Sequence, residues 1–225
     1  MHAGYLLDTV VGPDVSSGQS RVYEVLRCEP CLAWHVTPLP EPAALARYYA
    51  TQFYELDKPD YVARYERDRE WWEKCVHGPI LQQCKDYLRL DCPEEDQVRF
   101  LDIGAGPGIA LDVAQKRFGW ETWGIEPNKA LCDALWGRGH TMFHGTLETL
   151  PQGPLIALFD DHPRVHVAML YETLEHQGCP EETLLRVWEL LEPEGVLVVV
   201  VPNDWNPLQL AACQKLGLPH WFVSP

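Results

Sequence analysis

Three glycines spaced two residues apart could form a turn that binds a ligand. Gly104, Gly106 and Gly108 lie in the stretch FLDIGAGPGIALDV, between an apolar segment and a segment with helical periodicity. A strand-to-helix turn without Cβ atoms lets backbone N–H groups approach a ligand closely, and the N-terminus of the helix adds a partial positive charge. The chemistry of this turn therefore points to a nucleotide-like ligand.

Two known phosphate-binding loops match these residues poorly. A P-loop ends in Gly-Lys-Ser or Gly-Lys-Thr, whereas this loop continues as Ile109 and Ala110 and offers no lysine to a phosphate. The dinucleotide fingerprint G-x-G-x-x-G needs a glycine at position 109, and Pro107 removes one amide that a pyrophosphate would bind. The P-loop interpretation fails, and a dinucleotide stays open as a weaker alternative.

An acidic residue stands where a second ligand contact would be needed. Glu126 lies at the end of the apolar stretch in WGIEPN, 20 residues beyond Gly106. A carboxylate at that place can accept hydrogen bonds from both hydroxyls of a ribose. The alternative is a surface glutamate that begins a helix, and the sequence leaves both open.

Short apolar segments and the helical patterns between them must hold these residues in place. We predict strands at Val98–Ile103, Glu121–Ile125, Thr141–His144, Val165–Leu170 and Val196–Val201, and helices at Ile109–Phe118, Lys129–Trp136 and Glu181–Leu191. Apolar strands that alternate with helices are typical of a parallel sheet covered on both faces. The expected fold is α/β, with a Rossmann-like doubly wound sheet that binds ligands at the carboxyl ends of its strands.

The stretch LDIGAGPG resembles the first motif of the class I S-adenosylmethionine-dependent methyltransferases, which reads Asp-x-Gly-x-Gly-x-Gly. The likeness continues in order from Phe100 to Asn203, through WGIEPN, HGTLETLP, MLYETLEHQGCP and LLEPEGVLVVVVPN, where Gly195 makes a turn. It implies the class I methyltransferase fold, S-adenosyl-L-methionine as the cofactor and S-adenosyl-L-homocysteine as its product. In that family the loop wraps the amino-acid end and sugar of a ligand without phosphates, so no lysine is needed.

The resemblance also implies roles for residues that follow four of the strands. The implied cofactor-binding residues are Asp102, Gly104, Ala105, Gly106 and Gly108 in the loop, Glu126 and Pro127 at the ribose, Thr146, Leu147 and Glu148 at the adenine, and Tyr171 and Glu172 at the floor between cofactor and acceptor. A helix-initiating cluster is the alternative for residues 146–148. His176 is the candidate general base, because an unperturbed histidine, with a pKa of about 6.5, accepts a proton at neutral pH. Helix capping or packing is its alternative.

Within this class, the segment before the sheet resembles the ubiquinone-biosynthesis-type small-molecule methyltransferases, some of which carry a zinc-binding hairpin. The stretch VLRCEPCLAWH has Cys28 and Cys31 but no second Cys-x-x-Cys, and His35 would supply only a third ligand where a structural zinc site wants four. We therefore expect a degenerate hairpin without metal. Residues 1–40 are expected to be irregular, 41–93 to form N-terminal helices as a lid, and 94–225 to form the methyltransferase core.

Two features of the flanking segments complete this picture. Pro79 is expected to divide a long helical pattern, and the tyrosines and tryptophans of these helices could form a lid over an aromatic or apolar acceptor or simply pack. At the other end, the family core continues into a final antiparallel pair of strands. The chain offers a helix in NPLQLAACQKLGLPHWFVSP and no sequence for that pair, so we expect a core that lacks its last two strands through C-terminal truncation.

Charge and composition limit the partners. Asp and Glu total 33 against 18 Lys and Arg, a net charge of -15 that repels phosphate backbones and anionic membranes. No apolar run is long enough for a membrane span, and the eight scattered cysteines are typical of reduced thiols. We expect a cytoplasmic protein that binds neither nucleic acid nor membrane. Whether it forms a homodimer stays open.

The leading hypothesis is methyl transfer from S-adenosylmethionine to a small-molecule acceptor, with O-methylation ahead of N- or C-methylation. The reaction would be an in-line displacement at the sulfonium methyl, for which the protein aligns the reactants and removes a proton. One alternative is a protein that binds the cofactor without turnover. A nicotinamide-dependent oxidoreductase is a weaker one.

Overall fold

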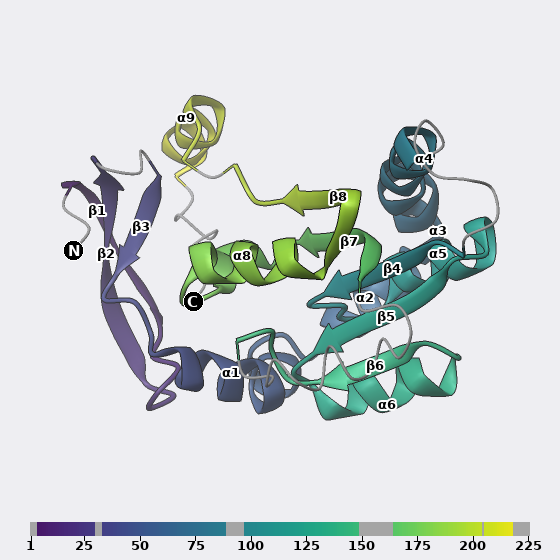
Figure 1. Cartoon of the computed structure of the whole chain (residues 1–225). Coiled ribbons are helices and arrows are strands. Elements are labelled where there is room, and N and C mark those ends of the chain that lie inside the picture. Colours follow the sequence, from purple (N-terminus) through teal and green to yellow (C-terminus); the bar gives the residue numbers. More distant parts are fainter. Residues whose placement is uncertain (1–3, 30–32, 89–96, 149–163, 204, 218–225) are drawn as a thin grey trace. The chain divides into compact units, whose positions relative to one another are not determined.

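In the computed structural model of the chain, the structure describes residues 4–29, 33–88, 97–148, 164–203 and 205–217 (Figure 1). The chain divides into two compact units. Residues 1–45 and 202–225 make up the smaller unit, and residues 46–201 make up the larger.

The smaller unit contains an antiparallel sheet and a helix. Strands β1 (Gly4–Pro13), β2 (Ser20–Cys28) and β3 (Trp34–Thr37) pair in the order β1-β2-β3. The expectation of an irregular segment over residues 1–40 is wrong for these stretches. Alternate residues of β2, among them Tyr23 and Val25, bury one face of the sheet. Helix α9 (Pro207–Leu216) begins at Asn206, whose side chain accepts the N–H of Gln209 at 3.0 Å.

The predicted zinc hairpin falls partly in this sheet. Cys28 is buried at the end of β2, and His35 lies on β3 opposite Leu26. Cys31 lies outside the described residues. Within the described ranges, no group of three or more His, Cys, Asp and Glu residues could hold a metal ion.

The larger unit is built on a parallel sheet of five strands in the order β6-β5-β4-β7-β8. The strands are β4 (Arg99–Ile103), β5 (Glu121–Glu126), β6 (Thr141–His144), β7 (Val165–Tyr171) and β8 (Leu191–Val200). Every residue of β4 is buried, as expected for a central strand covered on both faces. The predicted doubly wound sheet is confirmed, and its strand order reverses between β4 and β7, where such sheets bind ligands.

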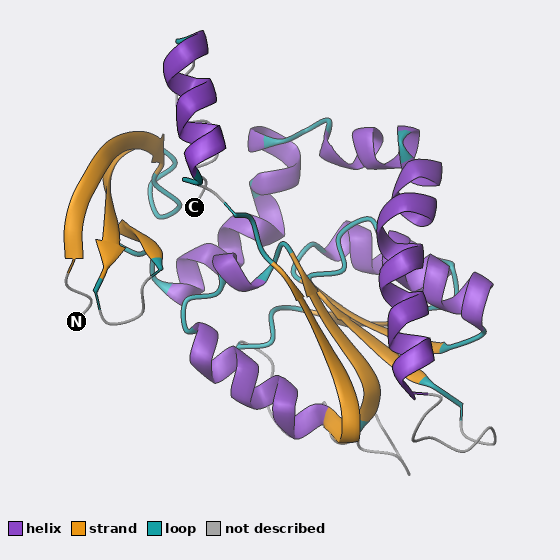
Figure 2. Ribbon diagram, turned by 90° about the horizontal axis from the view of Figure 1, so that it is seen from above, coloured by secondary structure: helices purple, strands orange, loops and turns teal. Residues whose placement is uncertain are grey.

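Helices cover both faces of this sheet, as Figure 2 shows. Helix α5 (Ile109–Phe118) connects β4 to β5 and α6 (Lys129–Gly137) connects β5 to β6, so both lead toward the β6 edge of the sheet. Helix α8 (Pro180–Leu190) connects β7 to β8 and leads toward the opposite edge. Right-handed crossovers then place α5 and α6 on one face and α8 on the opposite face. Two separate apolar clusters fill the space between the sheet and each layer.

The described segment before the sheet consists of six helices, most of them short. They are α1 (Pro42–Thr51), η1 (Phe53–Asp57), α2 (Tyr61–Arg67), α3 (Arg69–Trp71), η2 (Trp72–His77) and α4 (Gly78–Leu88). The expected break at Pro79 is wrong, because the chain stays helical there. The type of helix changes from π in η2 to α in α4 at Gly78, directly before Pro79.

Strand β8 differs from its prediction at its start. The turn expected at Gly195 lies inside β8, where Glu194 has a positive φ of 63° and the pairing register with β7 shifts between Val165 and Val167. The chain therefore bends within the strand before its regular pairing begins at Val196.

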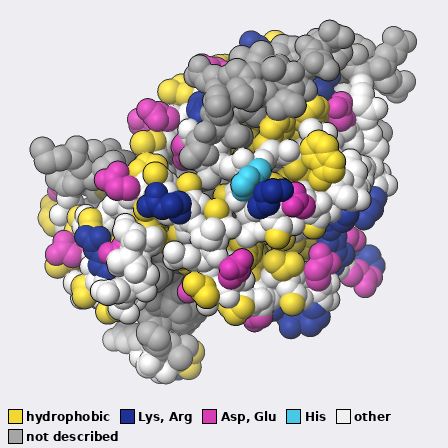
Figure 3. Space-filling view, turned by 90° about the horizontal axis from the view of Figure 1, so that it is seen from below, with side chains coloured by type: hydrophobic (Ala, Val, Ile, Leu, Met, Phe, Trp, Pro, Cys, Tyr) yellow, Lys and Arg dark blue, Asp and Glu magenta, His cyan; other side chains and the backbone are white. Residues whose placement is uncertain are grey.

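Two observations concern the surface. On the face drawn in Figure 3, acidic and basic side chains are interspersed and do not gather into one patch. In the part of the chain that the structure describes, no helix has the length and apolar character needed to cross a membrane.

Candidate cofactor-binding and active site

The glycine loop joins β4 to α5 at the carboxyl edge of the sheet. The N–H groups of Gly104 and Ala105 both donate to the carbonyl of Ile125 on β5, at 2.8 and 3.1 Å. The loop is thus tied to the neighbouring strand from its first residue. Gly104, Gly106 and Gly108 all have a positive φ, a conformation that glycine adopts without strain.

Both ends of the loop are packed against protein, and its middle is not. A Cβ on Gly104 would lie 2.5 Å from Oγ1 of Thr173, and a Cβ on Gly108 would lie 2.1 Å from Cδ2 of Leu135. A Cβ on Gly106 would have no atom closer than 3.7 Å. The side of the loop at Gly106 is therefore the one that a ligand could approach.

Glu126 ends β5 and holds the loop in place. It is 2% exposed, and its Oε2 accepts the N–H of Gly106 at 2.9 Å while its Oε1 accepts the N–H of Asn128 at 2.9 Å. The alternative of a surface glutamate that begins a helix is therefore wrong. Burial raises the pKa of Glu126 to about 7, although these two hydrogen bonds act in the opposite direction.

Asp102 brings a second buried carboxyl group to the same edge. It is 3% exposed in β4, and burial together with the charge of Glu126 raises its pKa to about 7. Among the described residues, neither carboxylate forms an ion pair, and no cation lowers either pKa. When these groups are ionised, the edge thus carries negative charge that no cation of the described ranges compensates.

Asn128 connects this edge to the preceding helices. Its Oδ1 caps α6 by accepting the N–H of Leu131 at 3.1 Å, and its Nδ2 donates to the carbonyl of Ala50 at 3.2 Å. Pro127 lies between it and Glu126, and its carbonyl is 3.0 Å from Nε2 of His144. The residues after β5 are therefore fixed by contacts to α1, α6 and β6.

The three residues predicted at the adenine follow β6, and two of them face α8. The side chain of Leu147 is buried in the cluster beneath α8, and its carbonyl accepts a hydrogen bond from Arg186. Glu148 accepts the hydroxyl of Thr183 at 3.4 Å. Their role at the adenine, with Thr146, stays a prediction, and the alternative of a helix start concerns residues from 149 on, which lie outside the described ranges.

The end of β7 presents Tyr171 and Glu172. The ring of Tyr171 packs against those of Trp72 and His77, with centroids 6.3 and 5.0 Å away, and burial raises its pKa to about 12. Glu172 has a φ of 49°, unusual for a residue with a Cβ, and its N–H donates to the carbonyl of Val200 at 2.8 Å. Strained backbone of this kind is concentrated at functional sites.

His176 lies in the short turn η3 (Leu174–His176) and is half-buried. Its ring centroid is 5.4 Å from that of Tyr49, and its Nε2 is 3.9 Å from Oε1 of Glu175. The structure therefore places the predicted base beside the N-terminal helices. Whether it acts in catalysis stays a prediction.

A continuous run of aromatic rings forms a cap over the carboxyl edge. Successive centroids are within 6.3 Å of one another along Tyr48, Tyr49, Phe53, Tyr54, Tyr61, Tyr65, Trp72 and Tyr171. The hydroxyl of Tyr54 is the atom nearest to the open side of Gly106, and burial and the charge of Glu126 raise its pKa far above its usual range. We refer to residues 46–77 as the cap.

Sequence reasoning missed two residues of this site. Asn128 carries the signal of a helix cap, since it precedes the apolar-periodic stretch KALCDALW, but its bond to Ala50 depends on the fold. Thr173 sits against Gly104 and donates its hydroxyl to the carbonyl of Tyr171 at 3.1 Å, and nothing in the sequence marks it.

Comparison with known proteins agrees with this architecture. A family described as "Methyltransferase domain" matches residues 65–222, well over half of the chain. No curated protein matches it.

Among solved structures, the chain is similar to the plantazolicin methyltransferase BpumL in complex with SAH, with a TM-score of 0.53 and 16% identity over 71% of this chain and 57% of that one. A second BpumL complex, with a pentazolic desmethylPZN analog and SAH, gives a TM-score of 0.51 and 17% identity over the same shares. The chain thus spans 57% of the length of these relatives, and at this identity the likeness is one of fold. With its parallel sheet, its glycine loop and the match over residues 65–222, the chain belongs to the methyltransferase domain family.

Proposed function

We propose that the chain binds S-adenosyl-L-methionine at the carboxyl edge of β4, β5 and β7 and transfers its methyl group to a small-molecule acceptor. The observation that carries this proposal is the pair of buried carboxylates, Asp102 and Glu126, which no cation pairs with in the part of the chain that the structure describes. They would repel a pyrophosphate at the adjacent loop, whereas a ribose with two hydroxyl donors and a sulfonium cation would offset them. Glu126 could bind the ribose of either cofactor, but the sulfonium cation would also offset the charge of the pair, which is why we favour this cofactor over a nicotinamide dinucleotide.

The residues present fit such a cofactor. Gly106 leaves one side of the loop open, and each oxygen of Glu126 keeps acceptor capacity beyond the one backbone N–H that it binds. Membership in the methyltransferase domain family and a fold shared with an SAH-bound methyltransferase give independent support. When bound, the cofactor supplies the electrophilic methyl group.

The chain's own residues would bind the cofactor, align the acceptor with it and accept a proton. Glu126 would accept the ribose hydroxyls, and Tyr171 with Glu172 would form the floor on which the acceptor meets the cofactor. The rings of the cap would exclude water and favour an aromatic or apolar acceptor. His176 would take the proton of a hydroxyl acceptor, which is why we favour O-methylation.

Calorimetry of the purified chain tests the cofactor directly. We expect micromolar binding of S-adenosylhomocysteine and no measurable binding of NADH. The opposite pattern would overturn the proposal in favour of a nicotinamide-dependent enzyme. Binding of S-adenosylhomocysteine without methyl transfer to any compound in a broad acceptor screen would favour a non-catalytic binding protein.

The proposed role of His176 has a separate test. Replacement by glutamine removes the proton acceptor and keeps a polar side chain. It should lower the rate of methyl transfer by about 100-fold or more and leave the affinity for S-adenosylhomocysteine unchanged. If both quantities change little, His176 only packs against Tyr49.

A further inference from the structure

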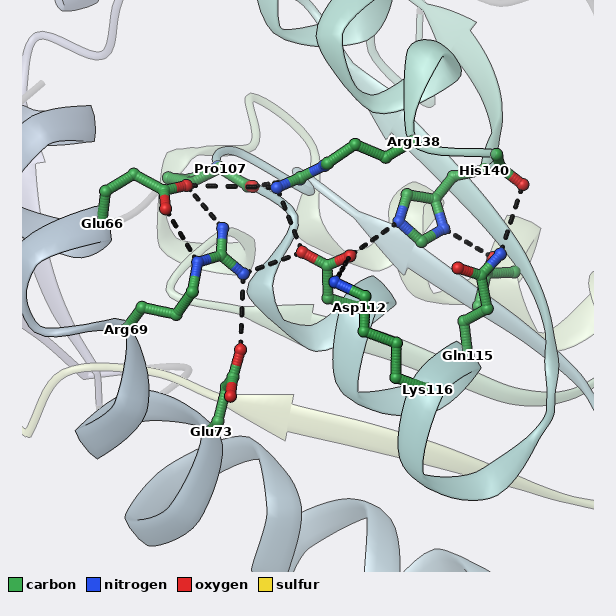
Figure 4. Close-up of polar contacts among 11 residues, drawn as sticks. Glu66, Arg69, Glu73, Pro107, Asp112, Gln115, Lys116, Arg138 and His140 are labelled. Atoms are coloured by element: carbon green, nitrogen blue, oxygen red, sulfur yellow. Dashed lines mark hydrogen bonds and ion pairs between the residues drawn. The ribbon is translucent and has the colours of Figure 1, made fainter.

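A buried aspartate outside the proposed binding edge collects an unusual number of charged partners. Asp112, in the first turn of α5, is 1% exposed. Its Oδ2 is 2.8 Å from Nη1 of Arg69 and 3.0 Å from Nη1 of Arg138, and its Oδ1 is 2.9 Å from Nζ of Lys116 and 3.3 Å from Nε2 of His140. Figure 4 shows the partners converging on this carboxylate from different elements.

These contacts dominate the electrostatics of the carboxylate. Burial alone would raise the pKa of Asp112, but hydrogen bonds from His140 and Lys116 and the charge of Arg138 hold it below its usual range. Breaking one contact of such a buried, charged group is costly, because the remaining charges lose compensation in a medium that solvates them poorly. The arrangement is therefore stiff.

On one side, Asp112 is joined to the cap. Arg69 precedes η2, and besides Asp112 it binds Glu66 through Nε at 2.7 Å and approaches Glu73 at 3.5 Å. Glu66, Arg69 and Glu73 belong to α2, α3 and η2, respectively. A single guanidinium thus ties three segments of the cap to α5.

On the other side, the same carboxylate is joined to the glycine loop. Arg138 follows α6, and while its Nη1 binds Asp112 its Nη2 donates to the carbonyl of Pro107, between Gly106 and Gly108. The loop also packs against this region, since a Cβ on Gly108 would lie 2.5 Å from the same Nη2. Arg138 therefore fixes the loop from behind, away from the open side of Gly106.

We propose that Arg69, Asp112 and Arg138 act as positioning residues that couple the cap to the glycine loop, so that docking of the cap sets the loop geometry in which the cofactor binds. The path runs Glu66–Arg69–Asp112–Arg138–Pro107, and every step is a charged or charge-assisted contact. The inference rests on the proposed function only in taking the loop as the cofactor site. None of these side chains needs to touch the cofactor.

A matched set of variants of the full chain tests this coupling. Arg69→Met removes the hydrogen-bonded link to the cap and keeps a long side chain; the only direct approach of Arg138 to the cap among the described residues, to Glu66 at 4.0 Å, is much longer. Arg67→Met is its surface control, because Arg67 pairs with Asp68 on the exposed side of α2. Lys116→Met is the control within the cluster, since it removes an exposed cation from Asp112 without touching cap or loop. Arg138→Lys keeps a charge at this place but cannot reach both Asp112 and Pro107.

Two measurements are made on each protein: amide hydrogen exchange of residues 104–112 without ligand, and the affinity for S-adenosylhomocysteine. Arg69→Met and Arg138→Lys should accelerate exchange in the loop and weaken affinity by about tenfold, within the range typical of coupling between two sites. Arg69→Lys should restore part of both. The two controls should stay within about twofold of wild type.

The coupling would be overturned if Arg69→Met and Arg138→Lys lowered the melting temperature but left both loop exchange and affinity unchanged. The cluster would then be purely structural. Equal effects of Lys116→Met would also overturn the coupling, because loss of charge at Asp112 would then suffice. Failure of the wild type to bind S-adenosylhomocysteine would instead refute the proposed function. The exchange measurement would still decide whether the cap positions the loop.

Discussion

Replacement of Glu126 by glutamine should stabilise the ligand-free protein at neutral pH and weaken its affinity for the cofactor. The stabilisation follows from the buried charge. Burial raises the pKa of this carboxyl group from 4.5 to about 7. At 1.36 kcal/mol per pH unit, the ionised form then costs the folded state about 3 kcal/mol above pH 7.

The pH window follows from the direction of this shift. The folded protein keeps the proton of Glu126 up to about pH 7, whereas the unfolded chain releases it near its ordinary value of 4.5. Wild type therefore loses stability as the pH rises from about 4.5 to 7, and the uncharged variant does not. Removal of the charge also relieves Asp102, whose pKa is raised in part by Glu126. The glutamine amide can accept only one of the two N–H groups, which reduces the gain.

We therefore expect a gain of about 1–3 kcal/mol at pH 8 and almost none at pH 4.5, equivalent to about 2–4 °C in melting temperature per kcal/mol for a chain of this size. Urea unfolding at both pH values measures it. Glu121→Gln is the matched control, because Glu121 is exposed at the opposite end of the same strand. The affinity for S-adenosylhomocysteine should fall by about 10- to 150-fold, the loss of charge-assisted hydrogen bonds to a ribose.

Stability and affinity should thus change in opposite directions. A variant damaged in its fold would lose both. Equal destabilisation of Glu126→Gln at pH 8 and pH 4.5 would refute the reasoning about an uncompensated buried charge. A pH-dependent gain in stability with unchanged affinity would leave that reasoning intact and refute the ribose contact.

Two further predictions concern residues around the loop and the cap. Gly108→Ala should cost about 1–3 kcal/mol more in urea unfolding than Gly119→Ala, because both positions have a φ above 70° but only the first would place its Cβ against Leu135. Equal losses would show that the loop adjusts freely. His77 is 5% exposed and burial lowers its pKa to about 4, so wild type should lose stability as the pH falls below about 6.5. His77→Phe should remove about 2 kcal/mol of that loss at pH 5, and an unchanged pH dependence would contradict it.

Much of the larger unit could be predicted from the sequence because its signals are local. The predicted helix at Ile109–Phe118 agrees with α5 in both bounds, since a glycine stands directly before it and another directly after it. The predicted strand at Thr141–His144 agrees with β6 in the same way. In both cases a glycine directly after the element marks its end.

The antiparallel sheet at the N-terminus could not be found in this way. Its strands contain apolar residues at alternate positions, but Gly, Pro and Ser residues around them favour turns. What makes them strands is pairing with one another, such as Val25 of β2 with Val36 of β3. In β2, the alternation of buried and exposed side chains is clear around Tyr23, where one face of the sheet is buried.

The site was predictable at its centre and less so at its margins. A carboxylate three residues before the start of a helix marks the end of β5, and so Glu126 could be identified. The direction of Leu147 is set by Arg186 and the buried cluster beneath α8, about forty residues later in the chain. Contacts between such distant residues leave no pattern in either stretch.

Asp112 and Glu126 are both buried carboxylates, but they differ in how their charge is compensated, which nothing in the sequence shows. Asp112 receives Arg69 and Arg138 and its pKa is held below its usual range, whereas Glu126 receives only backbone N–H groups and its pKa is raised. A carboxylate that the fold has already neutralised contributes to holding segments together, and a ligand would gain little by approaching it. A carboxylate left uncompensated destabilises the ligand-free protein and is stabilised by a partner that brings hydrogen-bond donors and positive charge. On this criterion Glu126 belongs to the binding edge, and Asp112 to the support that fixes the loop behind it.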